Sequence, residues 1–210
     1  KVMRRGQVDF MLAGGFDSML NPLGLSSFCL LGALSTDNEH PTKASRPFDA
    51  TRNGFVLGEG AGFLVLEEWD AAKKRGAKIY AEVLGYGVSC DAHHMTAAHP
   101  EGEGAIRAMR AAMKEAGVGI ENIDYISAHG TGTPTNDRIE SIAAKALFGA
   151  RSEHIPMSSI KSMIGHSIGA SGAIEAAALA MSLKTQVYPP TINLTNPDPA
   201  CDLDYIPNTA

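Results

Sequence analysis

The sequence contains few cysteines and has no excess of basic residues, and each shortage argues against a class of protein. The three cysteines, Cys29, Cys90 and Cys201, are widely spaced and odd in number. They do not read as a disulfide framework, so a reducing compartment is favoured. The formal net charge is -5 and no block of like charges occurs, whereas a general nucleic-acid-binding protein carries a basic stripe. We therefore expect no nucleic-acid partner.

Signals for secretion and for nucleotide binding are also missing. The opening residues, KVMRRGQVDFMLAGG, are interrupted by Asp9 and by glycines, so they do not form a signal peptide. No exact G-x-G-x-x-G or Walker A match occurs, which leaves nucleotide binding without support. We expect a protein without a cofactor that is cytoplasmic, or located in an organellar stroma or matrix in a eukaryote. Because the sequence lacks an initiator methionine, we also expect an internal fragment.

Enough apolar residues are present to form a sizeable core. Of the 210 residues, 44% are hydrophobic and 20% are charged, which fits one large domain or two small ones. Strand-like and helix-like patterns alternate, which predicts an α/β layer protein with substantial parallel strand pairing. Strands are expected at residues 8–13, 63–67, 79–86, 123–128 and 155–160. Helices are expected at residues 26–34, 68–75, 102–116, 136–148 and 168–183.

The stretch from Ser158 to Leu183 organises the rest of the chain. It runs from a strand into a turn that holds Lys161 and His166, and then into a helix whose one charged residue is Glu175. A helix that is apolar on nearly every side is buried, and this one is shorter than the ~20 residues of a membrane span. An unpaired buried carboxylate is costly. We therefore predict that Lys161 pairs with Glu175, and we expect no membrane segment.

Two histidines follow strands directly, in turns that lead into helices. His129 and His166 occupy these places, and sites form at the carboxyl ends of strands in open α/β sheets. Either ring could donate a hydrogen bond to a developing oxyanion or transfer a proton, or both could be hydrogen-bonded structural histidines. Thr131 and Thr133 could bind a polar linear substrate or cap the next helix. Thr135 or Asn136 is a further candidate for that cap.

Two other kinds of site compete with the histidine pair. Residues 165–169 match G-x-S-x-G, the nucleophile elbow of acyltransferases and hydrolases, with Ser167 as nucleophile. Against this, the following helix is unusually apolar and Lys161 is left without a role. A zinc site could form from Cys90, His93, His94 and His99. Adjacent histidines rarely both ligate one metal, and no second cysteine pair exists, so we expect no metal.

Five segments together resemble the β-ketoacyl-acyl carrier protein synthases of type II fatty acid synthesis. They are RPFDATRNGFVLGEGAGFLVLEE at 46–68, DAHHMT at 91–96, HGTGTPTND at 129–137, SSIKSMIGHSIGASGAIEA at 158–176 and PPTINLTNPDPACDLDYIP at 189–207. The resemblance covers nearly the whole chain. It implies the thiolase fold, in which two similar α/β halves pack as α-β-α-β-α layers with central buried helices. Residues 1–76 would end the N-terminal half, and residues 77–210 would form most of the C-terminal half.

The resemblance also implies a chemistry. Malonyl carried on acyl carrier protein loses carbon dioxide and attacks an acyl chain held on a cysteine. By motif, His129 and His166 would promote decarboxylation and stabilise the enolate, and Lys161, paired with Glu175, would organise His166. The pantetheine arm would be held by Thr131, Thr133 and Thr96. Acyl carrier protein is the implied partner, and a homodimer is the implied assembly of the full-length enzyme.

The chain departs from the family pattern in two places. None of its three cysteines matches the motif of the family's nucleophile, because Cys29 lies in the unrelated context SSFCLLGALS. The family's glycine-rich closing loop is also missing. We therefore expect the C-terminal part of an enzyme, inactive and prone to associate when isolated. A non-catalytic ketosynthase-like partner subunit is an alternative, although such a partner would not need to retain both histidines and the lysine.

Overall fold

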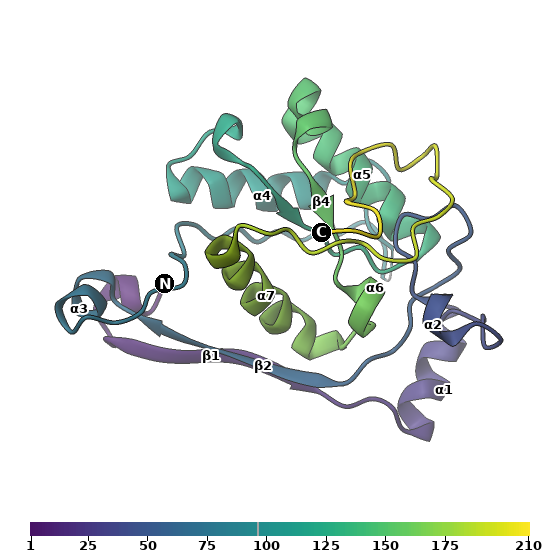
Figure 1. Cartoon of the computed structure of the whole chain (residues 1–210), viewed down its shortest axis with the longest axis horizontal. Helices are drawn as coiled ribbons and strands as arrows, with labels where there is room; N and C mark the ends of the chain where they lie inside the picture. Colours follow the sequence, from purple (N-terminus) through teal and green to yellow (C-terminus); the bar gives the residue numbers. More distant parts are fainter. Residues whose placement is uncertain (96) are drawn as a thin grey trace.

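The computed structural model describes residues 1–95 and 97–210 as a mixed α/β chain (Figure 1). The α-helices are α1 (Pro22–Leu30), α2 (Pro41–Ala44), α3 (Trp69–Lys74), α4 (Glu103–Ala116), α5 (Pro134–Phe148), α6 (Lys161–Ile164) and α7 (Ser171–Thr185). The strands are β1 (Phe10–Asp17), β2 (Gly60–Glu67), β3 (Ile126–Ser127) and β4 (Met157–Ser158). Short 3₁₀ turns are η1 (Met3–Arg5), η2 (Ile120–Asn122), η3 (Gly149–His154) and η4 (Ile168–Ala170). None of the described helices is long and apolar enough to cross a membrane.

Strands β1 and β2 form a long antiparallel ribbon, and α7 lies along one of its faces (Figure 1). The approach is close: a Cβ on Gly62 of β2 would lie 2.9 Å from the backbone of Ala173 in α7, so a glycine is required there. The burial of side chains alternates along both strands, as expected for a ribbon covered on one side. The other face exposes the large side chains of Phe10, Leu12, Phe16, Phe63 and Val65.

The main core lies around the parallel pair β3 and β4 and one face of α5. Ile126 is paired with Met157 and Ser127 with Ser158. The core cluster consists of Phe48, Ala128, Ala144, Phe148, Ile155, Met157, Leu194, Cys201 and Tyr205. Its members come from the 46–54 segment, from the residue after β3, from α5, from β4 and the segment before it, and from the proline-rich C-terminal segment. This core fixes the turn that follows β3, which is where His129 lies.

Most of the expected helices are present, but their ends differ from the expectation. Helix α5 starts at Pro134 with Thr133 in the N-cap position, so the cap assignment to Thr135 or Asn136 was wrong. Proline is favoured at the first helical position because its φ angle is already helical and it has no N–H to satisfy. The apolar helix begins only at Ser171, because Ile168 adopts a left-handed φ of 39° and interrupts it.

Three other expectations were wrong for the described residues. Residues 79–86 run without the ladder hydrogen bonds of a strand, since no described segment pairs with them. Parallel pairing is limited to β3 and β4, and β1 pairs with β2 in the antiparallel direction. Helix α7 is not enclosed on all sides, because Leu179, Met181 and Leu183 are exposed where nothing described covers them. The full α-β-α-β-α layering and the division at residue 76 remain predictions.

Phe48 is the central side chain of this core. It is 0% exposed and stacks on Tyr205, with ring centroids 3.9 Å apart. Replacing a buried phenylalanine by alanine removes its transfer free energy and leaves a cavity. We expect Phe48→Ala to lower the free energy of unfolding by about 3–5 kcal/mol in the intact protein, measured by chemical denaturation. The exposed Arg138→Ala in α5 is the control and should change it by less than about 0.5 kcal/mol. An equal loss in both variants would contradict the prediction.

Candidate active site

Four polar side chains meet between β3, α6 and α7. His129 follows β3, Lys161 is the first residue of α6, His166 follows α6 and Glu175 lies one turn into α7. The sequence placed the two histidines at the ends of neighbouring strands, and the structure brings their rings together. The ring centroids of His129 and His166 are 5.2 Å apart, with an interplanar angle of 85°.

The ammonium group of Lys161 is the centre of this arrangement. Lys161 is 1% exposed, and its Nζ forms an ion pair with Oε1 of Glu175, so the predicted pair is confirmed. The same Nζ donates to the carbonyl oxygen of His129 at 2.8 Å and lies 3.5 Å from Nδ1 of that ring. The resemblance implied that Lys161 organises His166, and this role stays a prediction; within the described residues, the histidine that the ammonium contacts is His129. The reason is that α6 begins directly beside the end of β3.

His129 is held as a neutral ring. Burial, then the charge of Lys161 and the proximity of His166, lower its pKa to about 4. An ammonium has only donors, so the Nδ1 atom that faces Lys161 must accept. The ring hydrogen is therefore on Nε2.

His166 is also a neutral ring with its hydrogen on Nε2, but different contacts determine this state. Its Nδ1 accepts a hydrogen bond from the backbone N–H of Ile168 at 3.2 Å and also lies 2.9 Å from Oγ of Ser171. A ring nitrogen that accepts carries no hydrogen, so the hydrogen is again on Nε2. Burial and then the charge of Lys161 lower the pKa of His166 to about 4. The backbone of His166 is fixed on both sides, by Val56 O at 2.7 Å and by Gly58 N at 3.0 Å.

The backbone of the turn after β3 is held by a carboxylate. Glu140 of α5 accepts from His129 N at 2.6 Å and from Gly130 N at 2.8 Å. Burial raises the pKa of Glu140 to about 7, even though these two hydrogen bonds favour its charged form. Sequence analysis missed this residue. Its signal was the position of an acidic residue two turns into the helix that follows a glycine-rich strand end.

Thr131 and Thr133 lie in the same turn, with their Oγ1 atoms 2.9 Å apart. Thr133 occupies the N-cap position of α5, but its side chain makes no capping hydrogen bond. Instead the two hydroxyl groups pair with each other, and Thr131 is nearly buried. The threonines therefore do not act as side-chain caps. Thr96, which was grouped with them, lies outside the described residues.

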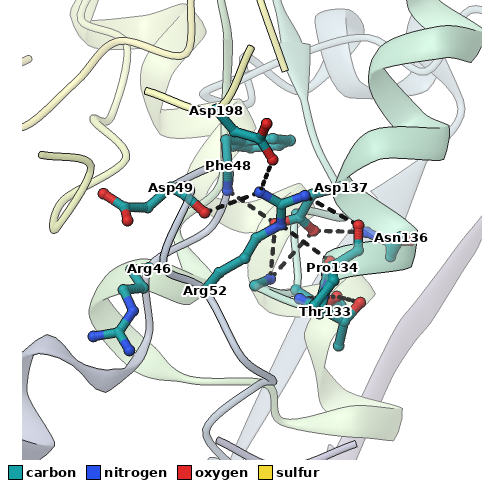
Figure 2. Close-up of polar contacts among 12 residues, drawn as sticks. Arg46, Phe48, Asp49, Arg52, Thr133, Pro134, Asn136, Asp137 and Asp198 are labelled. Atoms are coloured by element: carbon teal, nitrogen blue, oxygen red, sulfur yellow. Dashed lines mark hydrogen bonds and ion pairs between the residues drawn. The ribbon is translucent and has the colours of Figure 1, made fainter. Parts of the chain in front are cut away.

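Arg52 closes the far end of this turn and was not singled out from the sequence (Figure 2). Its guanidinium donates to Asp198 Oδ2 at 2.5 Å and to the carbonyl oxygens of Thr133 at 3.3 Å and Pro134 at 3.0 Å. Asp137 lies 3.5 Å away and is completely buried. A planar guanidinium with five donors can satisfy several acceptors at once, which a lysine cannot. The loop that carries Arg52 is therefore packed against the start of α5.

Asp137 links the same turn to the loop that carries Arg52 (Figure 2). Its carboxylate accepts from Gly132 N at 3.2 Å and from Phe48 N at 2.9 Å. Burial raises the pKa of Asp137, while these hydrogen bonds and Arg52 act in the opposite direction. Asn136 Nδ2 also donates to this carboxylate at 3.1 Å, so Asp137 connects the turn, the loop and the start of α5.

The structure does not support the competing sites. Ser167 is 1% exposed and its hydroxyl packs against Gly58, where a Cβ would lie only 3.1 Å from it. A nucleophile needs to be reachable, so this position does not suit Ser167. Within residues 1–95 and 97–210, no cluster of three His, Cys, Asp or Glu side chains could hold a metal ion. Cys29 and Cys90 are exposed, and Cys201 is buried away from the histidines in the core cluster, where burial raises the pKa of its thiol.

Two family models match the chain over most of its length. Residues 1–72 match the N-terminal domain of β-ketoacyl synthases and residues 80–195 match the C-terminal domain. The chain therefore belongs to the β-ketoacyl synthase family, as its motifs predicted, and it has the thiolase-like ketosynthase fold by homology.

Curated relatives agree with this assignment. The chain is 48% identical over 210 residues to 3-oxoacyl-[acyl-carrier-protein] synthase 2 of Coxiella burnetii, covering 100% of this chain and 51% of the relative. It is 49% identical over 207 residues to the Synechocystis protein of the same name, covering 99% of this chain and 50% of the relative. The chain thus spans about half the length of the curated relatives that it matches.

Solved structures resemble the chain equally well. A β-ketoacyl synthase from Burkholderia phymatum is 44% identical with a TM-score of 0.93, and the match covers 99% of this chain and 50% of that one. A second match comes from a type II polyketide synthase acyl-carrier protein in complex with its ketosynthase bound to the hexaketide. It is 45% identical with a TM-score of 0.97, covering 99% of this chain and 51% of that one.

Removing the carboxylate of Glu175 should leave the Lys161 ammonium buried without a counter-charge. We expect Glu175→Gln to lower the free energy of unfolding by about 3 kcal/mol, the lower end for a buried pair, because Glu175 is 18% exposed. Chemical denaturation measures the change. The double variant Lys161→Met, Glu175→Gln removes the buried charge as well and should recover most of the loss. A double variant that is less stable than Glu175→Gln would contradict this account.

Glu140 should make stability depend on pH. Its pKa is raised in the folded protein from 4.5 to about 7. Its stabilising contribution is therefore complete below about pH 4.5 and is lost as the pH rises through 7. We expect the stability of the wild type, relative to Glu140→Gln, to fall by at most about 3 kcal/mol between pH 5 and pH 8. The exposed Glu153→Gln is the control and should leave the pH profile of unfolding unchanged. A difference that stays constant with pH would be evidence against the raised pKa.

Proposed function

We propose that the protein carrying this chain catalyses the decarboxylative condensation of an acyl thioester with malonyl-acyl carrier protein in fatty acid chain elongation. The similarity to 3-oxoacyl-[acyl-carrier-protein] synthase 2 from two bacteria supports this assignment. The observation that carries the proposal is the state of the two histidines. Both are neutral, both have Nδ1 occupied as an acceptor, and so both have an Nε2–H available as a donor.

Two neutral N–H donors suit the charge that develops in this reaction. The carboxylate of the malonyl group leaves as carbon dioxide, and the electron pair of the broken C–C bond moves into the thioester as an enolate. The enolate oxygen then bears the negative charge, and Nε2–H groups of His129 and His166 stabilise it. The enolate carbon attacks the acyl thioester on the enzyme, forming the new C–C bond and releasing the cysteine thiolate. Neutral rings are preferable here, because they donate without being able to protonate the carbanion readily.

The remaining site residues have supporting roles in this proposal. Lys161, with Glu175 as its counter-charge, keeps His129 in the required tautomer. The paired hydroxyl groups of Thr131 and Thr133 bind the polar pantetheine arm, and Thr96 is included by motif. In this proposal the nucleophilic cysteine lies outside the 210 residues, since none of the three cysteines present matches the motif of the family's nucleophile.

The wider context of the protein follows from the same family membership. The partner is acyl carrier protein that carries acyl or malonyl pantetheine, which agrees with a similar ketosynthase having been solved with its carrier protein. The full-length enzyme is a cytoplasmic homodimer with the α-β-α-β-α thiolase layering. In that arrangement, residues 1–76 and 77–210 belong to its two halves.

The test is a variant of the full-length enzyme that loses one donor. We expect His166→Ala to lower malonyl decarboxylation about 10²- to 10³-fold, because one oxyanion donor is removed. Acylation of the cysteine should be largely intact, as measured by mass spectrometry of the acyl-enzyme. Ser167→Ala is the matched control from the adjacent position and should retain both steps, and a fluorophosphonate should not label Ser167. Near-normal condensation by His166→Ala would remove His166 from the mechanism.

A further inference from the structure

We propose that Asp17, at the end of β1, is a positioning residue that keeps the hydrogen of His166 on Nε2. Asp17 does not touch the His166 ring. It acts through the turn at residues 168–170, whose Ile168 N–H donates to Nδ1 of His166. This inference rests on the proposed function for its effect on catalysis, but the coupling between Asp17 and His166 can be tested separately.

The turn that serves His166 has an unfavourable backbone conformation. Ile168 has a φ of 39°, and a β-branched residue in the left-handed region is a marked outlier. Such strain persists only where the surrounding structure maintains it. In this conformation the N–H of Ile168 points back to His166 and donates to Nδ1. The hydroxyl of Ser171 lies 2.9 Å from the same Nδ1 but can accept as well as donate, so the N–H of Ile168 is the contact that requires Nδ1 to accept. The tautomer of His166 therefore depends on whatever holds residues 168–170.

Contacts from strand β1 fix the turn at residues 168–170. Oδ2 of Asp17 accepts a hydrogen bond from Gly169 N at 3.1 Å, directly after the strained residue. Two residues earlier, Gly15 lies against the carbonyl of Gly169: a Cβ at Gly15 would be 2.3 Å from that oxygen. The backbone of Gly169 is thus fixed at its N–H by a carboxylate and at its carbonyl by a close contact with the backbone of β1.

The negative charge of Asp17 strengthens its hydrogen bond to the backbone, which supports a positioning role for this residue. A carboxylate that accepts from a backbone N–H makes a stronger hydrogen bond than a neutral acceptor. The hydrogen bond joins residues far apart in the sequence, from β1 to the turn between His166 and α7. An acceptor on a separate strand can stabilise the strained conformation of the turn, which the turn's own contacts would not stabilise.

The effect of losing Asp17 should appear as a change in the state of His166. Without the acceptor, the turn can relax, and Nδ1 of His166 becomes free to carry the hydrogen in part of the molecules. We expect Asp17→Ala in the full-length enzyme to lower kcat for malonyl decarboxylation about 10-fold, with little change in KM. Asp17→Asn retains an acceptor oxygen and should recover most of the rate.

Nitrogen NMR of histidine-labelled enzyme tests the coupling without relying on activity. The His166 signals are assigned by their loss in His166→Asn. In the wild type they should be those of the Nε2–H tautomer, and in Asp17→Ala the Nδ1–H form should become detectable, while His129 remains unchanged. Asp9→Ala removes the same charge near the other end of β1 and should alter neither kcat nor the spectrum.

The outcomes separate this proposal from the proposed function. An unchanged His166 tautomer in Asp17→Ala overturns the positioning role, whether or not kcat falls. If the wild-type enzyme shows no condensation but the tautomer still shifts, the proposed function fails and the coupling stands. If Asp17→Ala does not fold, the same spectra are recorded on Asp17→Asn and Asp17→Ser, where a shift in the serine variant alone supports the proposal and none in either contradicts it.

Discussion

The arrangement of the site depends on one buried cation, the ammonium of Lys161. A buried ammonium must find acceptors for its hydrogens, and the acceptors here come from two other elements: Glu175 in α7 and His129 at the end of β3. Satisfying this one group therefore fixes α6, α7 and the strand end relative to one another. Burial is the main cause of the lowered pKa values of both imidazole rings, and the charge of the same ammonium lowers them further.

The turn after β3 is held at its two ends by opposite kinds of group. Glu140 accepts the N–H groups at its start, and Arg52 donates to the carbonyl oxygens at its end. Asp137 joins the two systems, because it accepts from Gly132 and lies beside Arg52 (Figure 2). A glycine-rich turn has high conformational freedom, so its rigidity here must come from these side chains and not from the turn sequence itself. The long loop that carries Arg52 is packed for this reason.

Sequence reasoning reached the parts of this site that follow from a single segment. A lone carboxylate in an apolar helix implied a nearby cation, and this gave the pair of Lys161 with Glu175. It did not reach Arg52, because an arginine in a loop has nothing unusual about its local pattern, and it missed Glu140 although its place in the helix after a glycine-rich strand end was a signal. The family resemblance linked Lys161 to His166, and that link stays a prediction; the contact of the ammonium with His129 depends on the tertiary fold and could not be predicted from one segment. The expected strand at 79–86 was wrong for a similar reason: a strand needs a partner, and its own sequence does not supply one.

The two histidines reach one chemical state through different physical means. His129 has its tautomer set by a charge, since an ammonium facing Nδ1 can only donate. His166 has its tautomer set by backbone geometry, since the N–H that occupies its Nδ1 belongs to a residue in a strained conformation. A charge acts over several ångströms and tolerates small displacements, whereas a hydrogen bond weakens steeply with angle. The pair therefore has one N–H donor whose position is robust and one that depends on the accuracy of the fold around residues 168–170.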